Sequence, residues 1–210
     1  ENRGYDIVRY SLEKFPENKD KIKDCDVVFI AVPTPTTPDG FDLSIVSACL
    51  KLLGRGKTAV IKSTILPGST RKLQEENPDI TVLHSPEFLR ERSAAQDTAA
   101  PERNIIGCPF VSDIGAGQAV NDKLTIKAEG VLRILPETDY ELVTSSENSE
   151  LIKYVGNDFL TMKVIFANVM SDYAKVVGAD WNVVAKAVGK DSRIGPSHLA
   201  VDFEGGRGAG

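Results

Sequence analysis

Hydrophobic residues in the first two thirds of the chain form short runs that alternate with segments of helical spacing. The short runs predict strands at residues 5–10, 25–32, 58–61, 80–83, 104–108 and 131–135. The run at 25–32 is almost wholly apolar, which is typical of a parallel strand covered on both faces. The segments between the runs predict helices at 19–24, 42–53, 68–76 and 113–121. This alternation predicts an α/β fold with a doubly wound, mostly parallel sheet.

After residue 135 the pattern changes, and we expect no further strands. Apolar residues recur every three or four positions from 145 to 177, and only Gly156 interrupts them. This spacing predicts one long helix of about 45 Å, which is suited to dimerisation. Asp180 should cap a shorter helix that ends at 188, and the glycine-rich residues 203–210 should form a loop. We therefore predict a Rossmann-like domain over 1–140 and a helical domain over 141–210.

The start of the chain lacks a feature that a doubly wound nucleotide-binding fold normally has. In such folds a glycine-rich loop between the first strand and the first helix binds phosphate groups. No G-x-G-x-x-G motif occurs near the start, and residues 4–8 have the character of the second strand. We therefore expect a truncated Rossmann-like domain, without its first strand and glycine loop.

Composition excludes several classes of partner. The 210 residues carry a formal charge of -5 without a basic run, which argues against nucleic acid or an anionic membrane. No apolar stretch approaches the roughly 20 residues that cross a bilayer. The three cysteines, Cys25, Cys49 and Cys108, form no CxxC motif, and the chain has two histidines. This pattern predicts reduced thiols in a cytoplasmic protein and no metal site.

Four stretches of sequence carry candidate chemistry. They are residues 32–36 (VPTPT), 62–70 (KSTILPGST), 86–91 (PEFLRE) with 101–107 (PERNIIG), and 150–157 (ELIKYVGN) with 178–180 and 191–195. Each is weak alone. In this order and spacing they resemble the UDP-glucose/GDP-mannose dehydrogenase family, over nearly the whole of its NAD-binding and central dimerisation domains.

The resemblance implies which residues contact the cofactor. Residues 32–36 follow a predicted strand at its carboxyl end, where ligands of open sheets bind. Without the resemblance, this loop and Thr64 would be interpreted as structural turns. The family pattern implies that Thr64 holds a water beside the reacting centre. The implied NAD contacts are Val32, Pro33, Thr34, Pro35, Thr36, Ser63, Thr64 and Glu91.

Two carboxylates follow the strand that is predicted at 80–83. Glu87 and Glu91 lie four residues apart and, without context, would be solvated side chains. A carboxylate at the carboxyl end of a strand can also act as a general base for hydrolysis. The resemblance implies that Glu87 is this base and that Glu91 contacts cofactor and substrate. Arg92 stands where the family often has glycine.

A lysine and an asparagine lie four residues apart on the predicted long helix. Lys153 would ordinarily be a solvent-exposed side chain, but an ammonium beside the amide of Asn157 suits a developing alkoxide. The resemblance implies this catalytic role for the pair, together with Thr64 and Glu87. Arg193 resembles an arginine that reaches the substrate of a neighbouring subunit; the alternative is a helix-end salt bridge. The implied substrate contacts are Glu87, Phe88, Leu89, Arg90, Glu91, Lys153, Asn157, Arg193, Gly208 and Gly210.

The glycine-rich tail, residues 205–210, resembles the family loop that leads into a nucleophilic cysteine. None of the three cysteines has the sequence context of that nucleophile. The resemblance implies oxidation of a sugar primary alcohol to a carboxylate with two NAD, through a thiohemiacetal and a thioester that Glu87 helps to hydrolyse. Because the cysteine and a third, UDP-binding domain are not found, we expect the 210 residues alone to be inactive.

Several alternatives remain open at this stage. The acidic residue that binds the ribose of NAD is expected near Ser11, where Arg9 and Glu13 are its neighbours, so NADP is an alternative to the favoured NAD. UDP-glucose is the favoured substrate, for polysaccharide biosynthesis, ahead of GDP-mannose and UDP-N-acetylhexosamines. A hydroxy-acid dehydrogenase and a non-catalytic dimerisation module are the alternatives from other classes. The long apolar helix predicts a homodimer.

Overall fold

The structure is a computed structural model that describes residues 4–109, 118–203 and 206–207. The side chains of residues 91, 118–121, 202, 203, 206 and 207 are not described. The chain forms two compact units, Glu1–Lys153 and Tyr154–Gly210. The predicted domain boundary between residues 140 and 141 stays a prediction.

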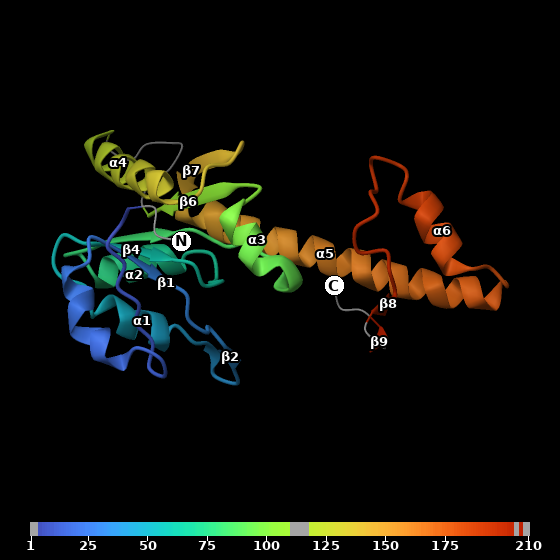
Figure 1. Cartoon of the computed structure of the whole chain (residues 1–210), viewed down its shortest axis with the longest axis horizontal. Helices are drawn as coiled ribbons and strands as arrows, with labels where there is room; N and C mark the ends of the chain where they lie inside the picture. The colour runs from blue at the N-terminus through green and yellow to red at the C-terminus, as the bar shows by residue number, and fades with distance from the viewer. Residues whose placement is uncertain (1–3, 110–117, 204–205, 208–210) are drawn as a thin grey trace. The chain divides into compact units, whose positions relative to one another are not determined.

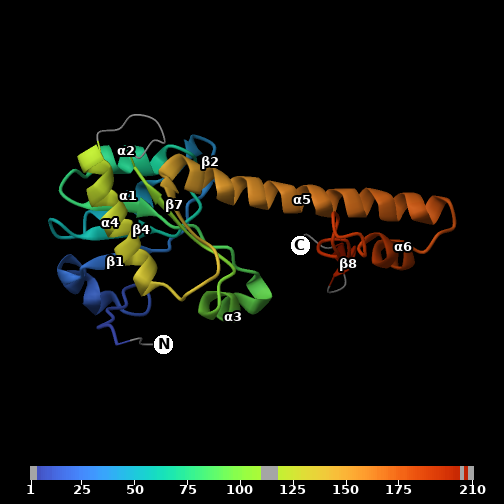
Figure 2. The ribbon, with the colours of Figure 1, turned by 90° about the horizontal axis from the view of Figure 1, so that it is seen from above.

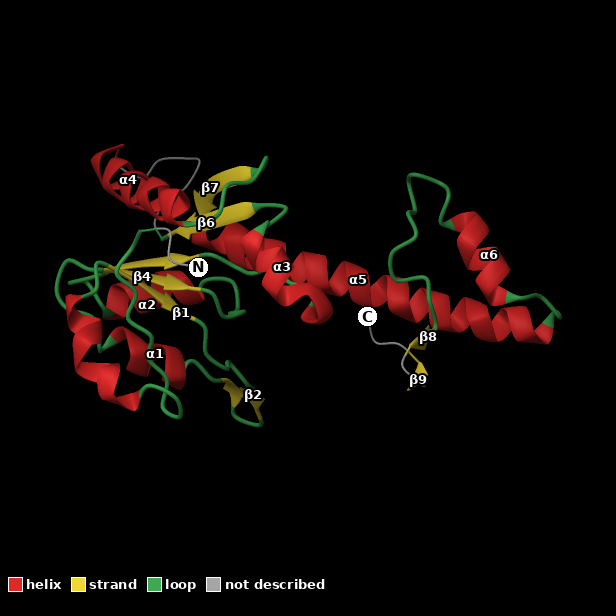
Figure 3. Cartoon of the chain, viewed as in Figure 1, coloured by secondary structure: helices red, strands yellow, loops and turns green. Residues whose placement is uncertain are grey.

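The first unit contains a five-stranded sheet (Figure 3). The strands lie in the order β1 (Val27–Ile30), β4 (Thr58–Ile61), β5 (Thr81–His84), β6 (Asn104–Cys108) and β7 (Glu141–Ser145). β1, β4 and β5 are parallel, and so are β6 and β7. β5 and β6 run antiparallel and pair only at His84 and Gly107. The predicted α/β fold with a mostly parallel sheet is confirmed.

Helices cover both faces of this sheet (Figure 1). Successive strand residues point to opposite faces, and β1, β4 and β5 each contribute to two apolar cores. On one face, α1 (Ser44–Leu50) and α2 (Ser69–Glu76) pack on β1, β4 and β5; on the other, α4 (Gln118–Ile134) packs on β4, β5 and β6. The first core includes Val46, Leu50, Ala59, Ile61, Leu73 and Val82, and the second includes Val60, Leu83, Ile106, Ala128 and Val131.

Three predictions near the start of the chain differ from the structure. Residues 5–10 form no strand, because a strand requires a neighbouring ladder and this segment pairs with none of the described strands. β1 lies at an edge of the described sheet, and Phe29 is 40% exposed, so this strand is not covered on both faces. The helix that was predicted at 19–24 is part of a 3-10 helix, η1 (Pro16–Asp24).

The region around residue 135 also differs from the prediction. Residues 131–135 form no strand; α4 continues to Ile134, because Ala128, Val131 and Leu135 follow helical spacing onto the second core. Strands do not stop there, since β7 pairs with β6 over five residues. Of the helix that was predicted at 113–121, residues 113–117 lie outside the described residues, and α4 begins at Gln118.

Short elements fill the remaining loops of the first unit. β2 (Thr36–Thr37) and β3 (Gly40–Phe41) form a small antiparallel pair. A 3-10 turn, η2 (Glu91–Ser93), leads into α3 (Ala94–Ala99). Both lie on the connections that follow the carboxyl ends of β1 and β5.

The long helix α5 (Ser146–Val176) begins in the first unit and continues into the second, and it confirms the helix predicted at 145–177. In the second unit the chain turns back after α5 into α6 (Trp181–Val188) (Figure 2). The Asp180 side chain accepts a hydrogen bond from Asn182 N, which confirms the predicted cap.

Two side chains hold the segment after α6 in place through hydrogen bonds. The Lys163 ammonium donates to Ile194 O and Ser197 Oγ, and Trp181 Nε1 donates to Leu199 O. The tail is not simply a loop, because β8 (Asp202–Phe203) pairs with β9 (Gly206–Arg207).

Candidate functional site

Three strands of the first unit end at the same level. The register pairs Ile30 with Ile61 and Ile61 with His84, so the residues that follow β1, β4 and β5 lie at one edge of the sheet. Ligands of open α/β sheets bind outside the carboxyl ends of parallel strands. The structure therefore brings residues 32–36, 62–64 and 85–87 to the edge where a ligand is expected.

Hydroxyl groups join the first two of these turns. Ser63 Oγ donates to Val32 O at 2.7 Å and accepts from Val32 N at 2.9 Å. Thr34 Oγ1 donates to Thr64 O at 2.7 Å. Ser63 is buried, so its hydroxyl connects the two strand ends, whereas Pro33, Pro35 and Thr36 are exposed.

The next turn carries an ion pair. The Lys153 ammonium donates to the Glu87 carboxylate at 2.8 Å and to the Glu87 carbonyl oxygen at 2.7 Å. The Lys153 side chain is only 9% exposed, and Leu89 N donates to the other carboxylate oxygen of Glu87. Burial raises the pKa of Glu87, but the bonds from Lys153 and Leu89 and the charges of Lys153 and Lys62 lower it more, to below its usual value. Glu87 is therefore held as a carboxylate.

A second lysine reaches the same turn. Lys62, the residue after β4, donates to Ser85 Oγ at 3.1 Å and lies 3.4 Å from Pro86 O. Burial lowers the pKa of Lys62 to about 8; the Glu87 charge opposes this shift and the Lys153 charge adds to it. Two ammonium groups thus converge on the turn at 85–87.

Phe88 and Arg90 lie beside this turn in different settings. The Arg103 guanidinium stacks on the Phe88 ring at 3.9 Å from the centroid, and the Lys153 ammonium lies 5.8 Å from it. Arg90 makes a bidentate ion pair with Asp97, which hydrogen bonds with Arg90 hold at a pKa well below the usual range. Leu89 is 41% exposed. These residues form the outer side of the site.

The first turns of α5 are anchored to α2 by a buried carboxylate. Glu150 is fully buried and accepts from Gly68 N at 2.6 Å, Thr70 N at 2.8 Å and Thr70 Oγ1 at 2.6 Å. Burial raises its pKa, and these hydrogen bonds oppose the shift. Because Lys153 lies one turn further along α5, this anchor fixes the Lys153 helix relative to the turn that carries Thr64.

A histidine makes a second anchor. His84 Nδ1 lies 2.8 Å from Ser149 Oγ, and burial lowers the pKa of His84 to about 4. Gly107 permits this approach, because a Cβ atom there would stand 2.5 Å from Ser149 Cβ. The start of α5 therefore lies against the sheet, where a larger residue at 107 would push it away.

The other predicted site residues lie elsewhere or outside the described part. Asn157 lies on α5 in the second unit and is exposed. Arg193 pairs with Asp191 at 2.6 Å and its side chain is 87% exposed, which matches the salt-bridge alternative. Glu91 begins η2, but its side chain is not described, and Gly208 and Gly210 lie outside the described residues.

Sequence reasoning assigned no role to Lys62, Ser85, His84 or Glu150. A lysine directly after a mostly apolar strand was the available signal for Lys62, since such a side chain starts from the core. Glu150 gave no signal, because a glutamate on a helix is ordinarily solvated.

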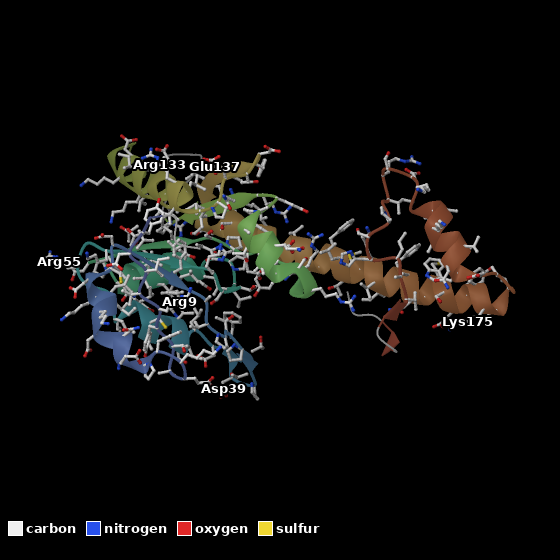
Figure 4. All side chains as sticks on the ribbon, in the orientation of Figure 1. Arg9, Asp39, Arg55, Arg133, Glu137 and Lys175 are labelled. Carbon is white, nitrogen blue, oxygen red and sulfur yellow. The ribbon has the colours of Figure 1, made fainter. Side chains whose placement is uncertain are left out.

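The described residues were also compared with the requirements of a metal site, a membrane span and a reactive thiol. They contain no cluster of three His, Cys, Asp or Glu side chains that could bind a metal ion. None of the described helices has the length and apolar character required to span a bilayer. All three cysteines are free thiols, and burial raises the pKa of Cys108 to about 12. Figure 4 shows labelled charged side chains such as Arg55 and Arg133 on the surface, and Arg55 pairs there with Asp79.

Comparison with known proteins gives two matches to family models. Residues 8–121 match the NAD binding domain of the UDP-glucose/GDP-mannose dehydrogenase family, and residues 147–209 match its central domain. The UDP-glucose 6-dehydrogenase of Rhizobium meliloti is 40% identical over 187 residues, which are 83% of this chain and 41% of that protein.

Solved structures agree with these matches. A UDP-glucose dehydrogenase from Pyrobaculum islandicum has a TM-score of 0.69 at 33% identity, over 87% of this chain and 43% of that one. A GDP-mannose dehydrogenase from Pseudomonas aeruginosa has a TM-score of 0.67 at 27% identity, over 88% of this chain and 44% of that one. The chain thus spans less than half the length of these relatives. Since the matched NAD binding domain covers more than half of the chain, the predicted NAD cofactor and the predicted family are confirmed, and the chain belongs to the UDP-glucose/GDP-mannose dehydrogenase family.

Proposed function

We propose that the whole protein oxidises the primary alcohol of a nucleotide-linked sugar to a carboxylate with NAD, converting UDP-glucose to UDP-glucuronate. The observation that carries this proposal is the ion pair between the buried Lys153 and the half-buried Glu87 at the carboxyl ends of the strands. It combines a cation that can stabilise a developing alkoxide with a carboxylate that can activate water.

The residues at the sheet edge fit a dinucleotide. Pro33, Pro35 and Thr36 are exposed beside the Thr34 and Thr64 turns, so a cofactor that lies along the edge would meet them. Val32 and Ser63 hold the two turns together behind these residues, and Glu91 follows on the neighbouring connection. The bound NAD supplies the hydride acceptor.

Lys153, Asn157, Thr64 and Glu87 are the proposed catalytic residues. Lys153 orients the sugar hydroxyl and stabilises its oxygen as the proton leaves, and the Asn157 amide assists it. Thr64 positions a water that takes part in this proton transfer. Glu87, held as a carboxylate, later removes a proton from the water that hydrolyses an acyl intermediate.

The nucleophile for that intermediate is not proposed among the three cysteines of this chain. Cys108 is fully buried and burial raises its pKa to about 12, which is the opposite of a reactive thiol. Burial also raises the pKa of Cys49, and the thiol of Cys25 lies within 3.5 Å of Lys21 O. In the proposed mechanism, a cysteine of the whole protein supplies the thioester.

The substrate contacts fall into two groups. Glu87, Phe88, Leu89 and Lys153 surround the strand-end turn directly. Arg90 and Arg193 each make a bidentate pair with an aspartate, so an anionic substrate must compete with a carboxylate for these guanidinium groups. Gly208 and Gly210 complete the proposed set of substrate contacts. The family pattern supports this set.

The second unit supports a homodimer. Along α5, large apolar side chains at three- and four-residue spacing are more than half exposed, including Val155, Phe159, Met162, Phe166, Val169 and Tyr173. A stripe of this size is normally covered by another surface. We propose that the same stripe of a second copy covers it. We also propose a reducing, cytoplasmic location, which the three free thiols support.

Initial rates with two nucleotide sugars test the substrate. GDP-mannose is the second candidate, because the Pseudomonas aeruginosa relative named for it matches 88% of this chain. The whole protein should reduce NAD with UDP-glucose at a kcat/KM at least about 100-fold above that with GDP-mannose. The opposite ratio would transfer the proposal to GDP-mannose, and no reduction with either sugar would reject it.

A further inference from the structure

The turn between β5 and Glu87 is held from two sides. Lys153 on α5 binds Glu87 itself, through the carbonyl oxygen and the carboxylate. Lys62 approaches from β4 and donates to Ser85 Oγ, with Pro86 O at 3.4 Å. The two ammonium groups thus contact three consecutive residues, of which the last is the proposed base.

The backbone of Lys62 is held by the sheet, which fixes the position from which its side chain reaches the turn. Its backbone N–H donates to Ile30 O at 2.8 Å and so continues the ladder between β1 and β4. Ser85 is 1% exposed, and its own N–H donates to Ile61 O at 2.8 Å. The backbones of both partners in the Lys62–Ser85 hydrogen bond are therefore held by the neighbouring strands.

The charges around Lys62 are few in the described part of the chain. Glu87 contributes a negative charge from the turn after β5, and Lys153 contributes a positive charge from α5. His84 on β5 is the third titratable group, and it is neutral above its pKa of about 4. The ammonium groups of Lys62 and Lys153 thus place positive charge beside the Glu87 carboxylate, which favours its ionised form.

We propose that Lys62 is a positioning residue of the reaction: it fixes the Ser85–Glu87 turn and keeps the Glu87 carboxyl ionised, so that Glu87 can accept a proton from water. This inference rests on the proposed function, because it gives Lys62 a task only where Glu87 acts as a base. Lys62 does not itself contact the reacting atoms. Its effect is exerted through Glu87.

A titration of the Glu87 carboxyl in the whole protein tests the electrostatic part without any need for turnover. Glutamate is labelled with 13C at the carboxyl carbon, and the Glu87 signal is assigned from its loss in Glu87→Gln. In Lys62→Met the midpoint should move to higher pH, and in Lys62→Arg it should return toward the wild-type value. A midpoint unchanged in Lys62→Met would overturn the proposal.

Lys57→Met is the matched control. Lys57 precedes the same strand, at the opposite edge of the sheet, and pairs with Asp26 at 2.8 Å. This variant loses the same charge without contact to the turn, so its Glu87 midpoint should equal that of the wild type. Equal shifts in both variants would show a general effect of net charge and would reject a specific role for Lys62.

The pH profile of turnover tests the consequence for the reaction. In Lys62→Met, kcat should fall by about twofold more at about pH 5 than at about pH 8, because more Glu87 is protonated at the lower pH. A uniform loss at all pH values would indicate a merely structural role. If the titration shifts while no variant or wild type turns over UDP-glucose, the contact is upheld and the proposed function fails.

Competitive acylation of the wild-type protein covers the case in which Lys62→Met does not fold. The reactivity of each lysine is followed against pH by mass spectrometry, with the exposed Lys175 as an internal standard. Lys62 should half-titrate near its pKa of about 8, well below the ordinary lysine value of about 10.4. A Lys62 that titrates at the ordinary lysine value would contradict the buried position on which the proposal depends.

Discussion

The helix α5 has two stretches of opposite character. In its first turns the polar residues Ser146, Ser149, Glu150 and Lys153 are buried, with exposures of 0%, 0%, 0% and 7%. Further along, the apolar residues Phe159, Met162 and Phe166 have exposures of 61%, 66% and 56%. Both stretches invert the usual preference for apolar residues inside and polar residues outside.

The difference shows what each stretch requires from its surroundings. A buried polar group must be hydrogen-bonded, and the first stretch is satisfied within the chain through His84, Gly68, Thr70 and Glu87. An exposed apolar stripe requires a covering surface, and the described residues of the chain leave it open to solvent. The first stretch is thus interpreted as part of a site and the second as an interface.

The largest effect is expected from Lys153→Met. This change removes the cation that stabilises the alkoxide and leaves the Glu87 carboxylate without its partner, so kcat of the whole protein should fall by about 1,000-fold or more. Lys127→Met is the control, since Lys127 lies on α4 and donates to Gly56 O at 3.1 Å, away from the strand ends. Steady-state kinetics that give Lys153→Met a kcat within tenfold of the wild type would contradict the site.

A charge in the stripe should separate the proposed dimer. Phe166→Glu would bury a carboxylate in an apolar interface, so the Kd of dimerisation should rise by about 100-fold or more. Lys175→Glu introduces the same group on another side of α5, where Lys175 is 68% exposed and lies near the end of the helix (Figure 4). Sedimentation velocity measures both. Equal association of the two variants, or a monomeric wild type, would reject the interface.

The buried anchor should matter for stability. The Glu150 carboxylate accepts hydrogen bonds from two backbone N–H groups and a hydroxyl, and Glu150→Gln replaces one of its oxygens with a donor. This change should lower the free energy of unfolding by about 2–4 kcal/mol. Glu147→Gln is the control, because Glu147 pairs with Arg71 at the surface and should cost about 1 kcal/mol or less. Urea unfolding distinguishes them, and equal losses would show that Glu150 is no special anchor.

A smaller effect should follow pH through His84. Its folded pKa of about 4 lies below the ordinary 6.5, so the folded state binds fewer protons than the unfolded state between these values. This contribution to stability is present above pH 6.5 and is lost as pH falls, by about 2 kcal/mol between pH 6.5 and pH 5. In His84→Gln the urea midpoint should depend less on pH over this window; an unchanged dependence would exclude His84 as its source.

The fold was largely predictable where burial imposes a simple pattern. β4 and β6 are buried at every residue, and their apolar runs predicted their bounds correctly. The strand β7 was not predicted, because its sequence ELVTS mixes polar and apolar residues and most of them are only half-buried. Residues 131–135 were taken for a strand because a short apolar run does not distinguish a strand from the end of a buried helix.

The site was predictable only in part, for a related reason. Glu87 and Lys153 were found through the family pattern, and the structure brings them to 2.8 Å. Lys62 and Glu150 were missed, because their importance depends on burial and on partners from other parts of the chain. A single sequence gives the residue type but not the neighbours that change its pKa or its hydrogen bonds.

The central claim is an oxidation that proceeds to the carboxylate, and the yield of NADH tests it most directly. The whole protein is mixed with a limiting amount of UDP-glucose and excess NAD, and the reaction is followed by absorbance until it stops. The account predicts two NADH for each UDP-glucose, because alcohol and aldehyde are each oxidised once. One NADH for each sugar, or none, would contradict it.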